Sequence, residues 1–188
     1  PLIVNPGYFS HDELQWAARA DVNSLADLAW IPWFDTEQYQ FRPLTFNLWL
    51  LLSYGLFNQP VLFHALLVLW GSLNAVLLFL VATQYFTKQT CAAGVGLFFV
   101  MSPYALYVHG WVATMADLLV MTALLLMLLL IIIKPDRFFT LLISMFLMVL
   151  ALMSKESAFS IPAVLGTFWL EIEEHTSELQ SRGPLVCR

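Results

Sequence analysis

Charged side chains are scarce in this sequence, at 11% of 188 residues, where soluble domains carry about 25%. Apolar residues make up 60%, so the composition excludes an ordinary soluble domain and predicts an integral membrane protein that lies in a lipid bilayer. The net charge is −5, and runs of basic residues are absent. The chain therefore offers no surface for a phosphate backbone, and nucleic acid is not an expected partner.

Several patterns that would indicate a known chemistry are also missing. The sequence has no glycine-rich phosphate loop, no nucleophile elbow and no Cys/His zinc spacing. Its two cysteines, Cys91 and Cys187, have the spacing of neither a metal site nor a disulfide framework. An Asn-x-Ser/Thr sequon is absent as well, which favours a bacterial inner membrane over the endoplasmic reticulum.

Acids and aromatic residues dominate the first 43 residues. Six acids stand there against only Arg19 and Arg42, and Trp and Tyr side chains are interleaved with them. Trp and Tyr prefer the membrane interface, whereas Lys and Arg accumulate on the cytoplasmic side. We therefore expect this segment to lie outside, with short helices at about 11–20 and 23–29.

The first of these helices has a recognisable start. Ser10 is the expected N-cap, and Glu13, three residues later, can complete a capping box. The 3.6-residue period then places Asp12, Trp16 and Arg19 on one face. An alternative remains open, because acids are also favoured at the positive end of a helix dipole without any further role.

Long apolar runs follow and predict an all-α membrane protein, a multi-pass transmembrane helix bundle whose outer first loop carries juxtamembrane helices. We expect the outer loop over 1–60 and a bundle of about five spans over 61–170. The run 44–57 reaches about 21 Å as a helix, short of the ~30 Å hydrocarbon core, so it is expected to return to the same side. The expected spans are 61–86, 91–108, 115–133 and 138–153, with a last one beginning within 158–170.

The polar turns between these runs decide the orientation. Lys88, Lys134 and Arg137 fall on the inner side, as the positive-inside rule prefers. If 44–57 does not cross, the polar residues of the remaining turns share the outer side with the N-terminal acids. If it crosses, the set is split across the bilayer. These polar residues are His109, Asp117, Lys155 and Glu156.

The two ends of the chain predict a piece of a longer protein. The sequence begins with Pro1 within what looks like a loop and shows no signal peptide, so we expect at least one upstream span. Residues 171–188 are expected to be a polar exit from the last span, followed from Thr176 by a non-native tail.

Asp117 is the strongest single signal for function, because an acid at the centre of a membrane helix costs ~2.5–3.5 kcal/mol. Its place near the helix start lowers that cost and leaves a structural role open. Lys155 and Glu156 form either a solvated turn or a cation that holds a lipid phosphate and an acid that orients it. Arg42 either anchors headgroups or binds phosphate through its planar fork. His109 is either a metal ligand or hydrogen-bonding group that supports the site, or an interfacial histidine.

Five short motifs occur in order along residues 8–170: Asp12-Glu13-(x)3-Ala17-(x)2-Ala20, Phe41-Arg42-Pro43-Leu44-Thr45, Met101-Ser102-Pro103, Ala116-Asp117-Leu118-Leu119 and Met153-Ser154-Lys155-Glu156. In order and spacing they resemble the GT-C superfamily of membrane glycosyltransferases, which use polyprenyl-phosphate sugars. The similarity is to protein O-mannosyltransferases, including tetratricopeptide-bearing ones, and to aminoarabinose transferases of lipid A.

The resemblance implies roles for individual residues. Asp12 would act at the reaction centre with Glu13 beside it, and Arg42 would lie near the lipid-linked donor. Asp117 would support the site. The chain departs from the family in having a single proline, Pro43, where some branches carry two, and we expect the acceptor site to be largely missing from this piece.

The implied chemistry is an inverting transfer of a sugar from a polyprenyl phosphate to a hydroxyl of a glycan, lipid or protein. Phosphate leaves without protonation when Arg42 or Lys155 stabilises its charge, whereas the acceptor hydroxyl needs a base such as Asp12. Some relatives bind a divalent cation, for which Asp12, Asp117 and His109 are candidate ligands without an assignable ligand set. We expect this piece alone to be inactive.

Two readings from other classes stay open. In a transporter or flippase for a polar or lipid-linked solute, Asp117, His64 and Asn74 would line a path across the bilayer. Polar groups within a span, such as His64, Asn74 and Gln84, more often mark hydrogen bonds between helices. In a non-catalytic membrane scaffold, the fold would persist without activity.

Overall fold

The structure is a computed structural model, and it describes residues 11–34, 40–103, 105, 112–134, 138–167 and 170. His109, the expected N-cap Ser10 and the C-terminal tail lie outside the described residues. The chain divides into two compact units, Pro1–Ala158 and Phe159–Arg188. In the second unit residues 161–167 are helical. All contacts discussed below lie within the first unit.

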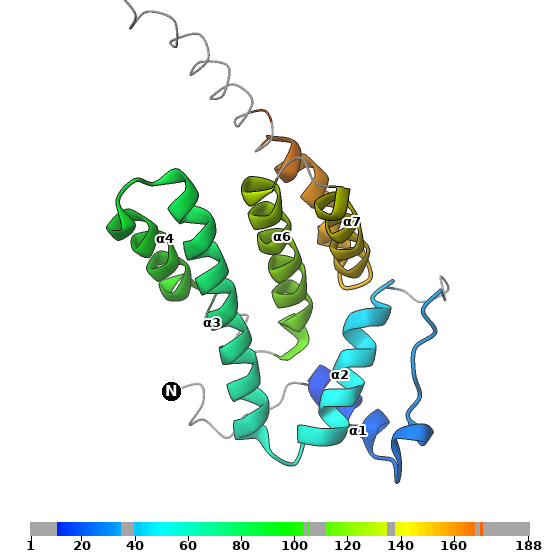
Figure 1. Cartoon of the computed structure of the whole chain (residues 1–188). Helices are drawn as coiled ribbons and strands as arrows, with labels where there is room; N and C mark the ends of the chain where they lie inside the picture. Colours follow the sequence, from blue (N-terminus) through cyan, green and yellow to red (C-terminus); the bar gives the residue numbers. More distant parts are fainter. Residues whose placement is uncertain are drawn as a thin grey trace, which may run out of the picture. The chain divides into compact units, whose positions relative to one another are not determined.

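Every regular element in the described ranges is a helix (Figure 1), so the predicted all-α class is confirmed for that part of the chain. The α-helices are α1 (His11–Ala20), α2 (Pro43–Leu56), α3 (Pro60–Tyr85), α4 (Gln89–Met101), α6 (Met115–Ile133) and α7 (Phe138–Leu152). The 3₁₀ helices are η1 (Leu25–Asp27), η2 (Val112–Thr114) and η3 (Glu156–Ser160).

Among the described residues, two stretches are long and apolar enough to cross a membrane: α3, and Val112–Ile133, which joins η2 to α6. The helices α4 and α7 are apolar too, but they have only 13 and 15 residues. The expected span 91–108 is not one continuous helix. Ser102 precedes Pro103 and takes an extended conformation with ψ of 148°, because the proline ring disfavours helical dihedrals in the residue before it.

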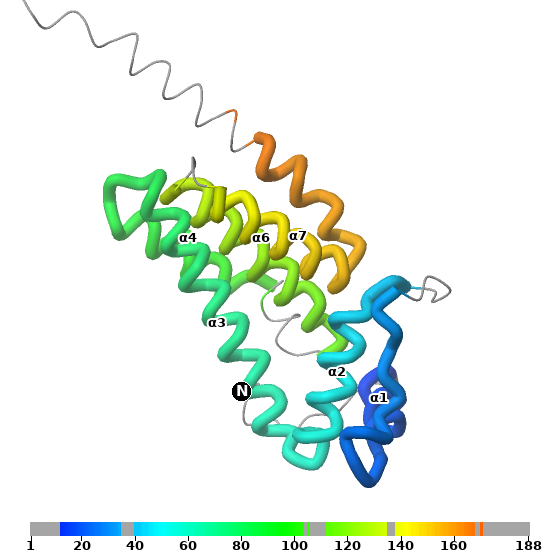
Figure 2. The backbone as a smooth tube through the Cα atoms, turned by 45° about the vertical axis from the view of Figure 1, so that its right-hand side comes forward, coloured from blue at the N-terminus to red at the C-terminus, as the bar shows by residue number. Residues whose placement is uncertain are grey.

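The helices of the first unit form two groups. α3 packs against α4 and α6, and α7 packs against α6. The remaining pair, α1 and α2, pack on each other, and α2 also contacts α3 and α6. Figures 1 and 2 show α3, α4, α6 and α7 side by side, with α1 and α2 near the end where α6 begins. The N-terminal pair therefore lies beside the first turn of α6, which carries Asp117.

A buried apolar cluster joins the two groups. Its members come from α2, α3, η2 and α6, and Trp16 of α1 packs against it. Burial of apolar surface of this kind is the main favourable term in holding helices together outside a membrane, and it fixes α2 against the start of α6. The buried residues are Trp49, Phe63, Leu67, Val112, Met115 and Leu118.

A buried polar contact links α3 to α6. The side chain of Asn74 is fully buried, and its amide donates to the Leu118 carbonyl at 3.1 Å. The Thr122 hydroxyl donates to Asn74 Oδ1 at 2.7 Å and accepts from the Trp70 indole N–H at 2.9 Å. Asn74 thus makes the hydrogen bonds between helices that its place within an apolar run suggests.

Small residues bring α4 close to α3. Ala92 and Gly96, four residues apart, are both buried. A Cβ atom at Gly96 would lie 3.5 Å from the Ala75 carbonyl oxygen and 3.6 Å from Phe79 Cβ, whereas one at Gly94 would have nothing within 4 Å. The α3 contact therefore involves the Gly96 side of α4.

We expect Gly96→Leu to lower the free energy of unfolding by about 1–3 kcal/mol, because atoms beyond Cβ must displace Phe79 or the α3 backbone. The matched change Gly94→Leu should have little effect, since that side of the helix is open. Thermal unfolding in detergent micelles measures both. Equal melting temperatures for the two variants would contradict the packing of α4 described here.

Candidate functional site

The turn that follows α7 is hydrogen-bonded to the first turn of α2. The Leu44 N–H donates to the Met153 carbonyl at 3.0 Å, and the Thr45 hydroxyl donates to the Ser154 carbonyl at 2.8 Å. A helix begins with N–H groups, and ends with carbonyls, that have no partner within the helix. The Leu44 N–H is such a group at the start of α2, and Met153 directly follows the last residue of α7. Pro43 occupies the first turn of α2, where a missing N–H costs nothing.

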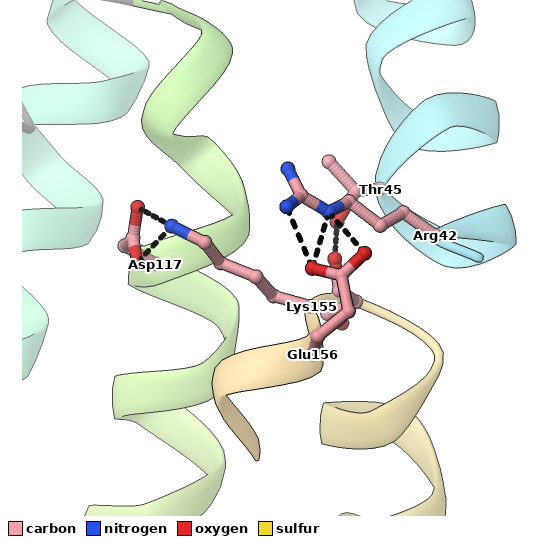
Figure 3. A network of polar contacts seen from close by, with 6 residues as sticks. Arg42, Thr45, Asp117, Lys155 and Glu156 are labelled. Carbon is pink, nitrogen blue, oxygen red and sulfur yellow. Dashed lines mark hydrogen bonds and ion pairs between the residues drawn. The ribbon is translucent and has the colours of Figure 1, made fainter. Parts of the chain in front are cut away.

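Two ion pairs extend from this turn to two different helices. Arg42 donates from Nε to Glu156 Oε1 and Oε2 at 3.1 and 2.9 Å, and from Nη2 to Oε2 at 2.6 Å. Lys155 Nζ lies 2.6 and 2.7 Å from the two carboxylate oxygens of Asp117. Figure 3 shows Lys155 and Glu156 pointing to opposite sides, one toward Asp117 on α6 and the other toward Arg42 at the start of α2.

This pairing differs from the expected one, in which Glu156 orients Lys155. The acid that holds Lys155 is Asp117, and Glu156 holds Arg42 instead. The hydrogen bonds from Arg42 lower the pKa of the Glu156 carboxyl below its ordinary value, and they outweigh the partial burial that would raise it. Both pairs are partly exposed, so each is worth at most about 1 kcal/mol as a simple ion pair.

A cleft of about 610 Å³ lies between these pairs and the N-terminal helices. Its walls come from α1, the segment after η1, α2, η2, the start of α6 and the turn before η3. Three cations and two acids line it. The lining residues are Asp12, Gln15, Trp16, Arg19, Ile31, Gln40, Arg42, Thr45, Phe46, Trp49, Ala113, Thr114, Asp117 and Lys155.

Stacked rings hold α1 at the cleft. Trp16 stacks on Phe46 and on Trp49, with ring centroids 4.9 and 5.2 Å apart. The Arg19 guanidinium lies 5.0 Å from the Trp16 ring centroid. Because Trp16 and Arg19 share a helix face with Asp12, the stack also presents Asp12 to the cleft.

An asparagine fixes the segment that follows η1. The buried Asn47 accepts the Ile31 N–H at 2.7 Å through Oδ1 and donates to the Ile31 carbonyl at 2.9 Å through Nδ2. Both backbone groups of Ile31 are thereby satisfied by a side chain of α2, as strand pairing would satisfy them elsewhere. This anchors one wall of the cleft.

The carboxylates around the cleft differ in what they contact. Asp117 and Glu156 are in ion pairs. Glu13 is buried, and its Oε1 accepts the Val112 N–H at 2.7 Å, so it joins α1 to η2 and is not among the lining residues. Asp12 is exposed and has no hydrogen-bond or ion-pair partner within the described part of the chain. It is the cleft carboxylate that can accept a proton without breaking a contact.

The structure brings together Asp12, Arg42, Asp117 and Lys155 on the walls of one cleft, and Glu156 is tied to it through Arg42. Glu13 lies on α1 but accepts the Val112 N–H and does not line the cleft, and His109 lies outside the described residues. The sequence had placed Arg19 and Trp16 on the Asp12 face without giving them a role. A second signal was available in the α2 residues Arg42, Thr45, Phe46 and Trp49, whose spacing also puts them on one face.

Within the described ranges, no three His, Cys, Asp or Glu side chains gather as a metal site would require. The suggested divalent cation therefore stays a prediction. The chain matches no protein-family model, no curated protein and no solved structure.

We expect Thr45→Val to lower the free energy of unfolding by about 1–3 kcal/mol, because it leaves the buried Ser154 carbonyl without its donor. Thr83→Val is the matched control: the Thr83 hydroxyl is exposed and bonds the Leu80 carbonyl of its own helix at 2.7 Å. Its effect should stay within about 0.5 kcal/mol. Chemical denaturation in micelles compares the two, and an equal loss in both would rule out a special role for the α2–α7 contact.

The Arg42–Glu156 pair should also make stability depend on pH. The pKa of Glu156 is lowered in the folded state, so its contribution is complete above the ordinary value and is lost as the pH falls through the lowered pKa. The loss should not exceed about 1 kcal/mol, since the pair is partly exposed. Melting temperatures between pH 7 and pH 3 should fall less steeply for Glu156→Gln than for wild type. Asp21→Asn removes an exposed acid outside the cleft and should retain the part of the pH dependence that the Arg42–Glu156 pair causes.

Proposed function

We propose that the cleft is the donor side of an inverting glycosyltransferase site, which moves a sugar from a polyprenyl phosphate to an acceptor hydroxyl. One observation carries this proposal: a carboxylate without a partner, Asp12, shares the cleft with the cations Arg19, Arg42 and Lys155. A base and a set of cations are the two requirements of the transfer, and the chain supplies both within one cavity.

The base acts on the acceptor. A hydroxyl attacks the anomeric carbon efficiently only if its proton is removed, and a positioned carboxylate typically accelerates such a step by ~10²–10⁴-fold. Asp12 is suited to this because it is exposed in the cleft and free of partners in the described residues. The charge of Asp117, in contrast, is already matched by Lys155.

The cations act on the donor. When the bond between the anomeric carbon and the phosphate oxygen breaks, that oxygen keeps the electron pair, and fixed positive charges stabilise it without a proton. With no covalent sugar intermediate, a single displacement inverts the anomeric carbon. Glu13, buried against Val112, is proposed to position α1 beside η2 and not to take part in proton transfer.

The donor's lipid chain requires a bilayer, and we propose a multi-pass membrane protein with the cleft at its outer face. α3 and Val112–Ile133 are long enough to cross. The shorter α4 and α7 expose large apolar side chains, among them Phe98 at 78% and Phe139 at 72%. Large apolar side chains that are exposed to this extent suit contact with lipid or neighbouring helices better than contact with water. A bacterial inner membrane is the proposed location.

A transporter receives less support from the same structure. A transporter needs polar groups that are free to hydrogen-bond a solute at several depths along the helix bundle. Asn74, the fully buried polar residue of α3, is hydrogen-bonded to Thr122 and to the Leu118 carbonyl. The polar residues around the cleft instead gather at one end of α6, as a reaction centre at a membrane face requires.

The test is transfer from radiolabelled polyprenyl-phosphate sugars by the full-length protein in membranes. Asp12→Asn should reduce the rate about 10²–10⁴-fold while donor binding persists, because the variant keeps the shape but loses the base. Asp21→Asn removes an acid of the same segment outside the cleft and should leave the rate unchanged.

If the Asp12→Asn variant transfers sugar at the wild-type rate, Asp12 is not the base and is only an acid favoured at the start of a helix. If the wild-type protein transfers no sugar from any polyprenyl-phosphate donor, the proposed activity is wrong, and the transporter or scaffold reading takes its place.

A further inference from the structure

We propose that Arg19 makes the direct contact to the donor phosphate, while Arg42 and Lys155 remain in their ion pairs and position the cleft walls. This inference rests on the proposed function, since that function supplies the ligand class: a lipid-linked phosphodiester or phosphomonoester. It assigns a binding role to a residue for which neither the motifs nor their order provides one.

The other two cations of the cleft are already engaged. Arg42 directs Nε and Nη2 at both oxygens of Glu156 over 2.6–3.1 Å, and Lys155 Nζ lies 2.6 and 2.7 Å from the Asp117 oxygens. A phosphate that bound either cation would have to displace an internal carboxylate held in place by the fold. The positive charge of each cation is already offset by the carboxylate that it pairs with, so little net attraction for a phosphate remains.

Arg19 differs in this respect. It lines the cleft and is exposed, and within the described residues no acid pairs with it. Its contact is with the Trp16 ring, at 5.0 Å from guanidinium to centroid. A contact with a ring uses none of the lone-pair acceptors that guanidinium N–H groups prefer, and within the described residues the Arg19 N–H groups have no such acceptor. Those N–H groups match two oxygens of one phosphate.

The position of Arg19 relative to the proposed base also fits. Asp12 and Arg19 are seven residues apart on one face of α1, which separates them by ~10.5 Å along the helix axis, with Trp16 between them. In an inverting displacement the base and the leaving phosphate stand on opposite sides of the sugar ring. One helix face therefore presents the base at one end and the phosphate contact at the other.

The experiment measures binding of geranylgeranyl phosphate to the purified full-length protein in detergent, with geranylgeraniol as the uncharged control ligand. Arg19→Gln should weaken binding of the phosphate by about tenfold or more, because it removes two charge-assisted hydrogen bonds. Arg19→Lys, which keeps the charge but loses the fork, should weaken it less. Lys88→Gln removes an exposed positive charge outside the cleft and should bind as wild type.

Melting curves accompany each titration, and Arg19→Gln should melt close to wild type because its lost contact is exposed. The alcohol should bind wild type and Arg19→Gln equally. If Arg42→Gln or Lys155→Gln weakens binding in folded protein while Arg19→Gln does not, the phosphate contact lies at the ion pairs and this inference is overturned, although the proposed function stands. If wild type binds the phosphate no better than the alcohol, both fail.

Discussion

The contact between the start of α2 and the end of α7 is the constraint on which the cleft depends. The Leu44 N–H, which has no partner within its own helix, donates to the Met153 carbonyl just after α7, and the Thr45 hydroxyl donates to the Ser154 carbonyl beside it. In an apolar setting, unsatisfied backbone groups cost several kcal/mol each, so such ends cannot separate without a replacement partner. Because α1 packs on α2, fixing α2 also fixes the face that carries Asp12.

The charged residues around the cleft form two groups, one whose charges are paired and one whose charges are not. Asp117 and Glu156 each hold a cation and thereby fasten α6 and α2 to one turn. Asp12 and Arg19, on α1, have no opposite charge bound to them within the described residues. The paired residues hold the walls of the cleft in place, and the unpaired residues are available to a ligand. A site needs both, since groups free to react cannot also hold the walls.

Much of the fold was predictable from the sequence, because helix starts and apolar lengths are local properties. The expected helices at 11–20 and 61–86 correspond closely to α1 and α3, and the short run at 44–57 is α2. The early end of α4 was harder, since it depends on the conformational preference of a single residue, Ser102, before proline.

The candidate site was predictable only as a list of residues. Which acid meets which cation depends on how helices lie in space, and the Arg42–Glu156 pair joins residues 114 positions apart. The sequence offered Lys155 as the neighbour of Glu156, yet the two side chains point to opposite sides of the turn (Figure 3). Glu13 shows the same limit, since its partner Val112 is 99 positions away.

The adjacency of Lys155 and Glu156 has a consequence for how this chain can vary. Lys155 pairs with Asp117 on α6, and Glu156 pairs with Arg42 at the start of α2. The order of the two residues in the sequence therefore determines which helix contacts each charge. Exchanging Lys155 and Glu156 would place a lysine beside Arg42 and a glutamate beside Asp117, so like charges would meet at both places. The composition and the net charge would be unchanged. Reversal of either remote partner alone would fail in the same way. A reversal of charge that keeps both ion pairs must therefore involve two positions at once, one in the turn and one in a remote helix.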